Sequence, residues 1–346
     1  MKRRPTSYDV ARVANVSRTT VSLVLNNVPD THINEATRKR VIDAAIQLNY
    51  TPDITGRRLA SGKSFNFGLV LRLNPDQVYA DAFLLNILLG IEQAARQVDF
   101  HVLFKPLNID DLSGYSQLIL GRHVDGIIVA GPRQDDTEII DIYEQGFPIM
   151  MIGQLPGTDV PFVAVDELEG AKIATQHLIE QGYSDIGMIT NAPLEYTSAQ
   201  LRLAGYQKAL RNAGIIPDKS LIGIGSYTPT SGYCAMSKLL SHSPNLSAVF
   251  VASDAVAFGA IQAAKEAGFS IPEDFAIVGF NDVPLAEYYD PPLSTVRLPA
   301  FELGQAAAER LSKLVAGETL DPSGFLLNTE LIVRNSSIKT SLRQED

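Results

Sequence analysis

The sequence offers few residue combinations that could support covalent or metal-dependent catalysis. Its five histidines are not spaced as metal ligands, and it holds neither a nucleotide-binding glycine loop nor a nucleophile elbow. The acid pairs Asp110-Asp111 and Asp135-Asp136 are more simply solvated loop residues, and a single cysteine, Cys234, excludes an internal disulfide and a cysteine-cluster metal site. We therefore expect no enzymatic activity, no metal and no cofactor.

A short segment near the N-terminus has the residue types that bind nucleic acid. Arg18 can donate two hydrogen bonds to a guanine edge, and Thr19 suits a base edge or a thymine methyl group. Small hydroxyl side chains beside them suit phosphate oxygens, namely Ser17, Thr20 and Ser22. We expect these residues, together with Leu23, to face DNA.

The neighbouring sequence predicts the helices that would position this segment. Residues 8–14 form a short helix with Val10 and Val13 on one face, and Asn15-Val16-Ser17 ends it. Ser17 is a suitable N-cap for a second helix over residues 18–25, so the pair predicts a helix-turn-helix. A third helix runs from Asn34 to about Asn49 and stops before Pro52.

Charge is distributed unevenly along the 346 residues. The net charge of −10 argues against nucleic acid, but residues 1–63 carry eleven Lys/Arg and only five Asp/Glu, against eighteen and thirty-four in the remainder. A basic module on an acidic body is the pattern of a DNA-binding headpiece, although charge alone leaves open a solvated basic face without a partner. No apolar run is long enough to span a membrane, and the start is unlike a signal peptide, so we expect a cytoplasmic protein.

From residue 66 onward, short apolar runs alternate with amphipathic stretches. The expected strands are 67–71, 126–130, 149–152, 162–165, 186–189, 248–251 and 276–280, and the clearest helices are 84–98, 170–181, 199–213 and 255–267. Such alternation predicts doubly wound α/β architecture with parallel sheets, and its length predicts two lobes. Ligands of such folds lie at the carboxyl ends of the strands.

The order of several sequence blocks resembles the LacI/GalR (lactose-repressor) family. The headpiece blocks are "YDVARVANVSRTTVSLVLNN", "INEATRKRVIDAAIQLNYTPD" and "RRLASGKS", and the body blocks include "VDGIIVAG", "VAVDELEGA", "SAQLRLAGY", "VFVASDAVAFGA" and "ELIVRNSS". The resemblance implies an all-α helix-turn-helix headpiece (1–52), a hinge (53–63) and a periplasmic-binding-protein-like effector domain (64–341). Lobe 1 would hold about 64–162 and 295–324, and lobe 2 about 163–294 and 325–341, with crossings near 162–166, 294–297 and 325.

The same resemblance implies roles for the DNA-binding residues. Arg18, Thr19 and Leu23 would contact bases. The DNA backbone would be contacted by Asn26, His32, Asn34, Thr37 and Tyr50. The hinge contributes Arg57, Arg58 and Leu59, and its leucine would insert into the minor groove and kink the duplex. An ordinary buried leucine is the alternative for Leu59. Asp53 and Gly56 depart from the family pattern in ways that disfavour hinge ordering on DNA.

Strand ends and the resemblance together predict an effector pocket. Arg202 would grip effector hydroxyls or a carboxylate, and Tyr227 would stack on a ring. The other candidates are Asp81, Phe83, Arg133, Asp136, Tyr196, Ser198, Ser253, Asp254 and Asn281. Arg202 could instead form a structural salt bridge, Asp254 and Asn281 could be helix N-caps, and Phe83 could belong to the core. Gly153 and Ser253 replace polar residues of the lactose repressor, so lactose-like binding is not expected.

These expectations combine into one function. The chain would be a repressor of carbohydrate-utilisation genes that binds a pseudo-palindromic operator in double-stranded DNA and is switched allosterically by a small sugar between its lobes. The alternative effector is a purine or another metabolite, which could act as a corepressor. A two-fold operator requires a homodimer, and the tail "IKTSLRQED" lacks the leucine-rich helix of a tetramer. A transport binding protein would need an export signal and no headpiece.

Overall fold

The chain divides into two compact units, Met1–Ser64 and Phe65–Asp346. The computed structural model describes residues 5–26, 31–51, 58, 61–80, 82–109, 111, 114–321 and 324–338. The first unit contains the headpiece, and the second unit is the body.

The headpiece is a three-helix unit made of α1 (Ser7–Ala14), α2 (Arg18–Leu25) and α3 (Glu35–Gln47). Its core holds residues from all three helices, among them Val10, Val21 and Val41. Asn15 adopts a left-handed conformation (φ 54°) that ends α1, and asparagine tolerates this conformation better than most residues. The prediction that Val13 shares a buried face with Val10 is wrong. Val13 is 44% exposed because Ala11 and Ala14 complete the buried stripe on the other side of Val10.

Hydrogen bonds at the helix starts fix where α2 and α3 begin. The Ser17 hydroxyl accepts a hydrogen bond from the Thr20 amide (3.0 Å), and Asn34 Oδ1 accepts one from the Thr37 amide (2.8 Å). Each side chain satisfies an amide that has no partner inside its helix. The N-cap at Ser17 was predicted, and it sets the start of the second helix of the helix-turn-helix.

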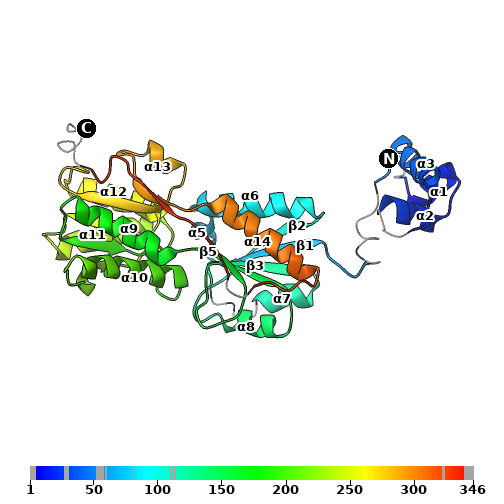
Figure 1. The fold of residues 1–346 in the computed structure, drawn as a ribbon. Coiled ribbons are helices and arrows are strands. Elements are labelled where there is room, and N and C mark those ends of the chain that lie inside the picture. The colour runs from blue at the N-terminus through cyan, green and yellow to red at the C-terminus, as the bar shows by residue number, and fades with distance from the viewer. Residues whose placement is uncertain are drawn as a thin grey trace. The chain divides into compact units, whose positions relative to one another are not determined.

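The body consists of two lobes, each built on a six-stranded sheet (Figure 1). In lobe 1 all neighbouring strands are parallel. The strand order is β11 (Phe325–Leu327), β5 (Phe162–Val165), β4 (Ile149–Ile152), β3 (Gly126–Ala130), β1 (Asn66–Arg72) and β2 (His101–Leu107). Helices α6 (Ala82–Gln97) and α14 (Ala300–Val315) pack on one face, and α7 (Gly114–Leu120) and α8 (Thr137–Glu144) pack on the other.

Lobe 2 repeats this plan with one antiparallel strand at its edge. Its order is β12 (Glu330–Ile332), β10 (Ser294–Arg297), β9 (Ala276–Asn281), β8 (Ala248–Val251), β6 (Ile186–Ile189) and β7 (Ile222–Gly223), and β12 runs antiparallel to β10. One face is covered by α9 (Glu167–Glu180) and α10 (Thr197–Asn212), the other by α11 (Pro229–His242) and α12 (Asp254–Glu266). Shorter helices are α5 (Pro75–Ala80), α13 (Leu285–Tyr288) and the 3-10 turn η1 (Lys219–Leu221). The predicted doubly wound architecture is therefore present in both lobes.

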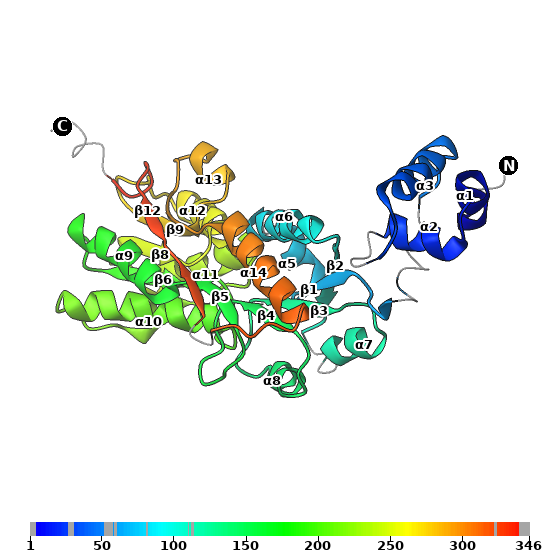
Figure 2. The ribbon, with the colours of Figure 1, turned by 45° about the vertical axis from the view of Figure 1, so that its right-hand side comes forward.

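The chain crosses between the lobes three times, after β5, after β10 and after β11, and the predicted crossings lay near 162–166, 294–297 and 325. β5 and β11 belong to the lobe 1 sheet and β10 belongs to the lobe 2 sheet, so the crossings follow these strands rather than precede them. The sequence indicated the residues near each crossing. It did not indicate to which of the two sheets each short strand belongs, because an apolar run can pair with either sheet. Figure 2 shows the red end of the chain passing from one lobe to the other. Only the pairing partners, Val163 for Phe325 and Val278 for Ser294, decide the assignment.

Candidate functional site

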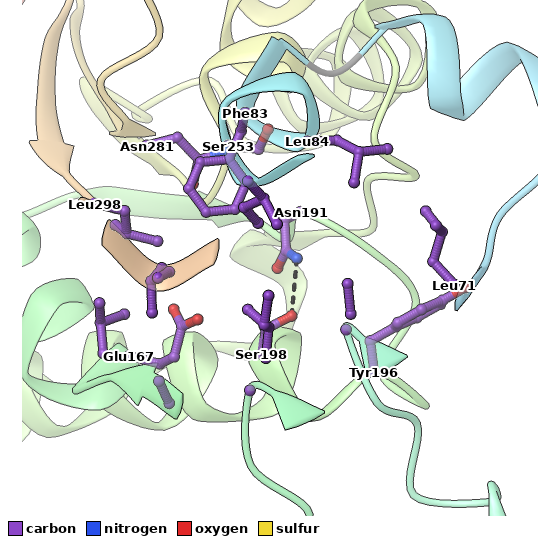
Figure 3. Close-up of a pocket in the computed structure, with 18 of the residues that line it drawn as sticks. Leu71, Phe83, Leu84, Glu167, Asn191, Tyr196, Ser198, Ser253, Asn281 and Leu298 are labelled. Carbon is purple, nitrogen blue, oxygen red and sulfur yellow. Dashed lines mark hydrogen bonds between the residues drawn. The ribbon is translucent and has the colours of Figure 1, made fainter. Parts of the chain in front are cut away.

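A cavity lies between the two lobes where the carboxyl ends of their strands face each other (Figure 3). Eight strands place a residue at or just beyond their carboxyl end on its wall, from β1, β3, β4 and β5 of lobe 1 and from β6, β8, β9 and β10 of lobe 2. The apolar lining is Leu71, Leu73, Phe83, Leu84, Ile87, Ala130, Gly131, Ile152, Gly153, Ala164, Val165, Leu298 and Leu303. The polar lining is Glu167, Asn191, Tyr196, Ser198, Arg202, Tyr227, Ser253 and Asn281. Largely apolar walls with a few polar groups are typical of small-molecule sites.

Arg202 is held in place from three sides. Its Nε donates to Glu167 Oε2 at 2.6 Å, its Nη1 donates to the carbonyl oxygen of Ala252 at 2.5 Å, and its guanidinium lies 4.0 Å from the centre of the Phe280 ring. Glu167 is the first residue of α9, directly after the crossover from β5. The structural salt bridge weighed as an alternative role for Arg202 is thus present, and both of its members line the cavity.

Two asparagines, Asn191 and Asn281, line the cavity. Asn191 follows β6 and donates from Nδ2 to the Ser198 hydroxyl at 3.1 Å, as Figure 3 shows. Asn281 ends β9 with an unusual backbone conformation (φ 118°) rather than capping a helix. The Oδ1 atoms of both are buried and have no hydrogen-bond partner among the described residues. A buried acceptor without a partner is costly, so both atoms are suited to a ligand that donates.

Two tyrosines and a lobe 1 phenylalanine supply the aromatic surface. The Tyr196 and Tyr227 rings meet edge to face, with centroids 5.4 Å apart and planes at 84°. Tyr196 donates its hydroxyl to the carbonyl oxygen of Arg72 in lobe 1 at 2.5 Å, and burial raises the pKa of its phenol, which keeps the donor protonated. Phe83 of α6 faces the same space from lobe 1.

Seven of the eleven predicted effector residues line this cavity, but three do not. Arg133 instead forms a salt bridge with Asp135 (2.6 Å), and its guanidinium lies over the Tyr196 ring. Asp136 is buried among lobe 1 residues, where it accepts hydrogen bonds from Arg72 Nε (3.0 Å) and the Tyr115 hydroxyl (2.7 Å). Burial raises the pKa of Asp136 above its ordinary value. The fourth, Asp81, lies outside the described residues.

Asp254 is the third predicted residue that the structure places elsewhere. Its two oxygens accept hydrogen bonds from the Val283 amide (2.9 Å) and the Thr295 hydroxyl (2.6 Å), and it is completely buried. Burial raises its pKa to about 6. It is the first residue of α12 and does not act as an N-cap, because its carboxylate joins α12 to β10 and to the loop after β9.

Two polar residues of the cavity wall, Glu167 and Asn191, were not predicted. Both follow strands that were expected from the sequence, 162–165 and 186–189, so the rule that ligands lie at carboxyl ends of strands could have found them. Glu167 stands within a run of acidic residues that does not distinguish it from its neighbours, and Asn191 lies in a loop with no distinctive motif.

The predicted DNA-binding residues that the structure describes are exposed or half-buried. Arg18, Thr19 and Ser22 are exposed, while Thr20 and Leu23 are partly covered. The Ser17 and Asn34 side chains serve as helix caps, and Asn26 Nδ2 donates to the Ser22 hydroxyl at 3.2 Å. His32 and Arg58 are exposed, and Thr37 and Tyr50 are partly buried. Arg57 and Leu59 lie outside the described residues, as do Asp53 and Gly56.

Other kinds of site find no support in the part of the chain that the structure describes. It contains no group of three or more His, Cys, Asp or Glu side chains that could hold a metal ion. No helix in these ranges is long and apolar enough to cross a membrane.

Two family models match separate parts of the chain, one in each compact unit. Residues 6–53 match the bacterial regulatory proteins of the lacI family, and residues 175–337 match the periplasmic binding protein-like domain. The transcriptional regulator CelR of Thermobifida fusca is 34% identical over 342 residues, which cover 97% of this chain and 99% of CelR.

Two solved structures extend the similarity to the whole fold. A complex of the regulator CelR with cellobiose has a TM-score of 0.75 and 32% identity, and covers 96% of this chain and all of that one. The lac repressor dimer bound to operator and an anti-inducer has a TM-score of 0.84 and 27% identity, over 97% of this chain and all of that one.

Proposed function

Because the chain belongs to the lacI family of bacterial regulatory proteins, a family of DNA-binding transcription regulators and not of enzymes, we propose that it is a repressor released from or held on its operator by a small sugar. We further propose that it acts as a homodimer on a pseudo-palindromic operator, since a two-fold site requires two headpieces. The observation that carries the sugar proposal is the set of polar side chains that lobe 2 contributes to the cavity between the lobes.

The headpiece supports operator binding through α2. A helix-turn-helix places its second helix in the major groove, and Arg18 and Thr19 occupy the exposed N-terminal turn of α2. Ser17, at the N-cap, has its hydroxyl committed to the Thr20 amide, so we assign Ser17 to shaping the helix start as well as to phosphate contact. In this proposal Arg18 supplies base discrimination.

The cavity supports a sugar because it combines hydrogen-bonding groups with apolar surface. Two amides, two serine hydroxyls, a carboxylate and a guanidinium share one wall, and a sugar hydroxyl both donates and accepts. The apolar lining and Phe83 suit the C–H faces of a sugar ring. The similarity to a regulator solved with cellobiose is consistent with this proposal.

A purine or related base is the second candidate, favoured by the three aromatic side chains at the cavity. A base held by stacking needs rings that are roughly parallel on either side. Tyr196 and Tyr227 are instead nearly perpendicular, at 84°, so these two rings do not form such a pair.

The proposed switch is a change in how the lobes meet when the cavity fills. Tyr196 of lobe 2 bonds to the Arg72 carbonyl of lobe 1, and a ligand beside it contacts both lobes. The ligand can shift operator affinity only by its difference in affinity for the two lobe arrangements.

A melting-temperature screen followed by operator titration tests this function. Purified protein is melted with mono- and disaccharides, sugar phosphates and nucleobases, because a ligand that binds the native state must raise the melting temperature. A sugar that raises it should also change operator affinity. Arg18→Ala should weaken operator binding by roughly 1–3 kcal/mol while keeping the sugar-induced shift. A shift with nucleobases alone would contradict the sugar proposal.

A further inference from the structure

The described cavity lining carries one positive and one negative side chain, and these two are paired with each other. Arg202 Nε lies 2.6 Å from Glu167 Oε2, and the two side chains are 5% and 12% exposed. Each charge is therefore already compensated within the wall. A ligand anion that approached Arg202 would also approach the Glu167 carboxylate.

The remaining contacts of Arg202 reinforce this arrangement. Nη1 donates to the Ala252 carbonyl, and one face of the guanidinium covers the Phe280 ring. A bidentate grip on a carboxylate or phosphate needs two parallel donors of the guanidinium fork, and here Nε is committed to Glu167 and one Nη1 hydrogen to the Ala252 carbonyl, which leaves only the Nη1–Nη2 end of the fork for an anion. What Arg202 retains is sufficient for a hydroxyl oxygen.

Two buried acceptor atoms of cavity-lining residues lack a hydrogen-bond donor in the part of the chain that the structure describes. Asn191 Oδ1 and Asn281 Oδ1 are buried acceptors without a partner among the described residues. A hydroxyl can satisfy them, whereas a carboxylate or phosphate dianion brings acceptors only. Placed near these oxygens, an anion would face three acceptor groups, including Glu167.

We propose that the effector is an uncharged polyhydroxy compound, and that Glu167 is the specificity residue that excludes uronates and sugar phosphates. This inference rests on the proposed function, because it concerns the ligand of the same cavity. A guanidinium can bind either a hydroxyl or a carboxylate, and the proposal assigns Arg202 to hydroxyl binding only.

Matched neutral and acidic sugars test the proposal. Calorimetric titrations of the full chain would use D-glucose, D-glucuronate and D-glucose 6-phosphate, then D-galactose and D-galacturonate. Glu167→Gln removes the negative charge and keeps the shape, so it should bind at least one acidic probe about tenfold more tightly than the wild type, or better. Glu169→Gln is the matched control, since Glu169 lies on the same helix but pairs with Lys172 away from the cavity.

The outcomes are distinct. A gain for Glu167→Gln but not for Glu169→Gln supports the proposal. No gain for any acidic probe overturns it, and so does a wild type that binds a uronate or phosphate more tightly than the neutral parent. If Glu167→Gln does not fold, Glu167→Asn takes its place. A neutral sugar that binds without changing operator affinity would refute the proposed function and leave this inference standing.

Discussion

At the scale of single residues, carboxylates that follow strand ends differ in whether they reach the cavity. The predicted Asp136 and Asp254 each belong to a buried hydrogen-bond network within their own lobe, whereas Glu167, which was not predicted, lines the cavity. All three lie close to strand ends in sequence. Whether such a carboxylate faces the cavity or the interior of its lobe depends on the path of the helix or loop that follows the strand.

The pH dependence of stability should reveal the buried Asp254. Its pKa of about 6 in the folded chain, against 3.8 ordinarily, means that the native state holds this proton more tightly than the unfolded state. Its contribution to stability is therefore full below about pH 4 and is lost as the pH rises to about 6. Asp254→Asn cannot ionise, so the free energy of unfolding of the wild type should fall relative to the variant across this window, by on the order of 2 kcal/mol.

Urea denaturation of both proteins between pH 4 and pH 7 measures this difference. The Asp254→Asn variant would also carry a constant cost, because one amide hydrogen of the new side chain would face a donor, so the slope with pH is the informative quantity. Parallel curves for the two proteins would contradict a raised pKa.

At the scale of elements, two helices of lobe 1 pack so closely that no side chain fits at the point where they cross each other. In lobe 1, α6 and α14 meet at Gly90 and Gly304. A Cβ added to Gly304 would overlap the Ile87 carbonyl oxygen, and one added to Gly90 would overlap that of Phe301. Both contacts are to backbone, which cannot move without separating the helices. This pair covers the sheet face whose strand ends form the lobe 1 wall of the cavity.

Gly304→Ala should therefore destabilise the body by roughly 1–3 kcal/mol, the usual cost of overpacking, despite the better helix propensity of alanine. Chemical denaturation followed by circular dichroism measures the change. Glu309→Ala, at an exposed position of the same helix, serves as the control and should alter stability by less than about 0.5 kcal/mol. Equal stability of the two variants would show that the helices can separate at little cost.

At the scale of the whole body, the lobes are joined by hydrogen bonds as well as by the three crossovers. The side-chain amide of Gln77 on α5 donates to the Ser226 hydroxyl at 2.8 Å, and the backbone amide of Gln134 donates to the backbone carbonyl of Glu195 at 2.8 Å. Both contacts link lobe 1 to lobe 2 beside the cavity. They favour the lobe arrangement in which the cavity walls face each other.

Gln77→Ala should weaken binding of the sugar found in the melting screen by roughly two- to tenfold, since it removes a hydrogen bond that holds the binding arrangement. Calorimetric titration measures the affinity. The control is Gln176→Ala, which removes a glutamine bonded to Glu180 within its own helix and should leave affinity unchanged. An unchanged affinity in Gln77→Ala would mean that this contact does not select between lobe arrangements.

The sequence by itself determined the parts of this protein that depend on local order along the chain. Helix-turn-helix spacing, the N-cap at Ser17 and the alternation of apolar strands with amphipathic helices are properties of neighbouring residues, and all are present as predicted. The family followed from blocks such as "SAQLRLAGY" standing in the right order.

Only the tertiary structure decided which polar residues meet in the cavity. Glu167 and Arg202 are 35 positions apart and on different helices, and Asn191 and Asn281 follow different strands. Their meeting depends on sheet order and on the crossovers, and neither is encoded in local periodicity. The charge balance of the cavity is therefore a property of the fold.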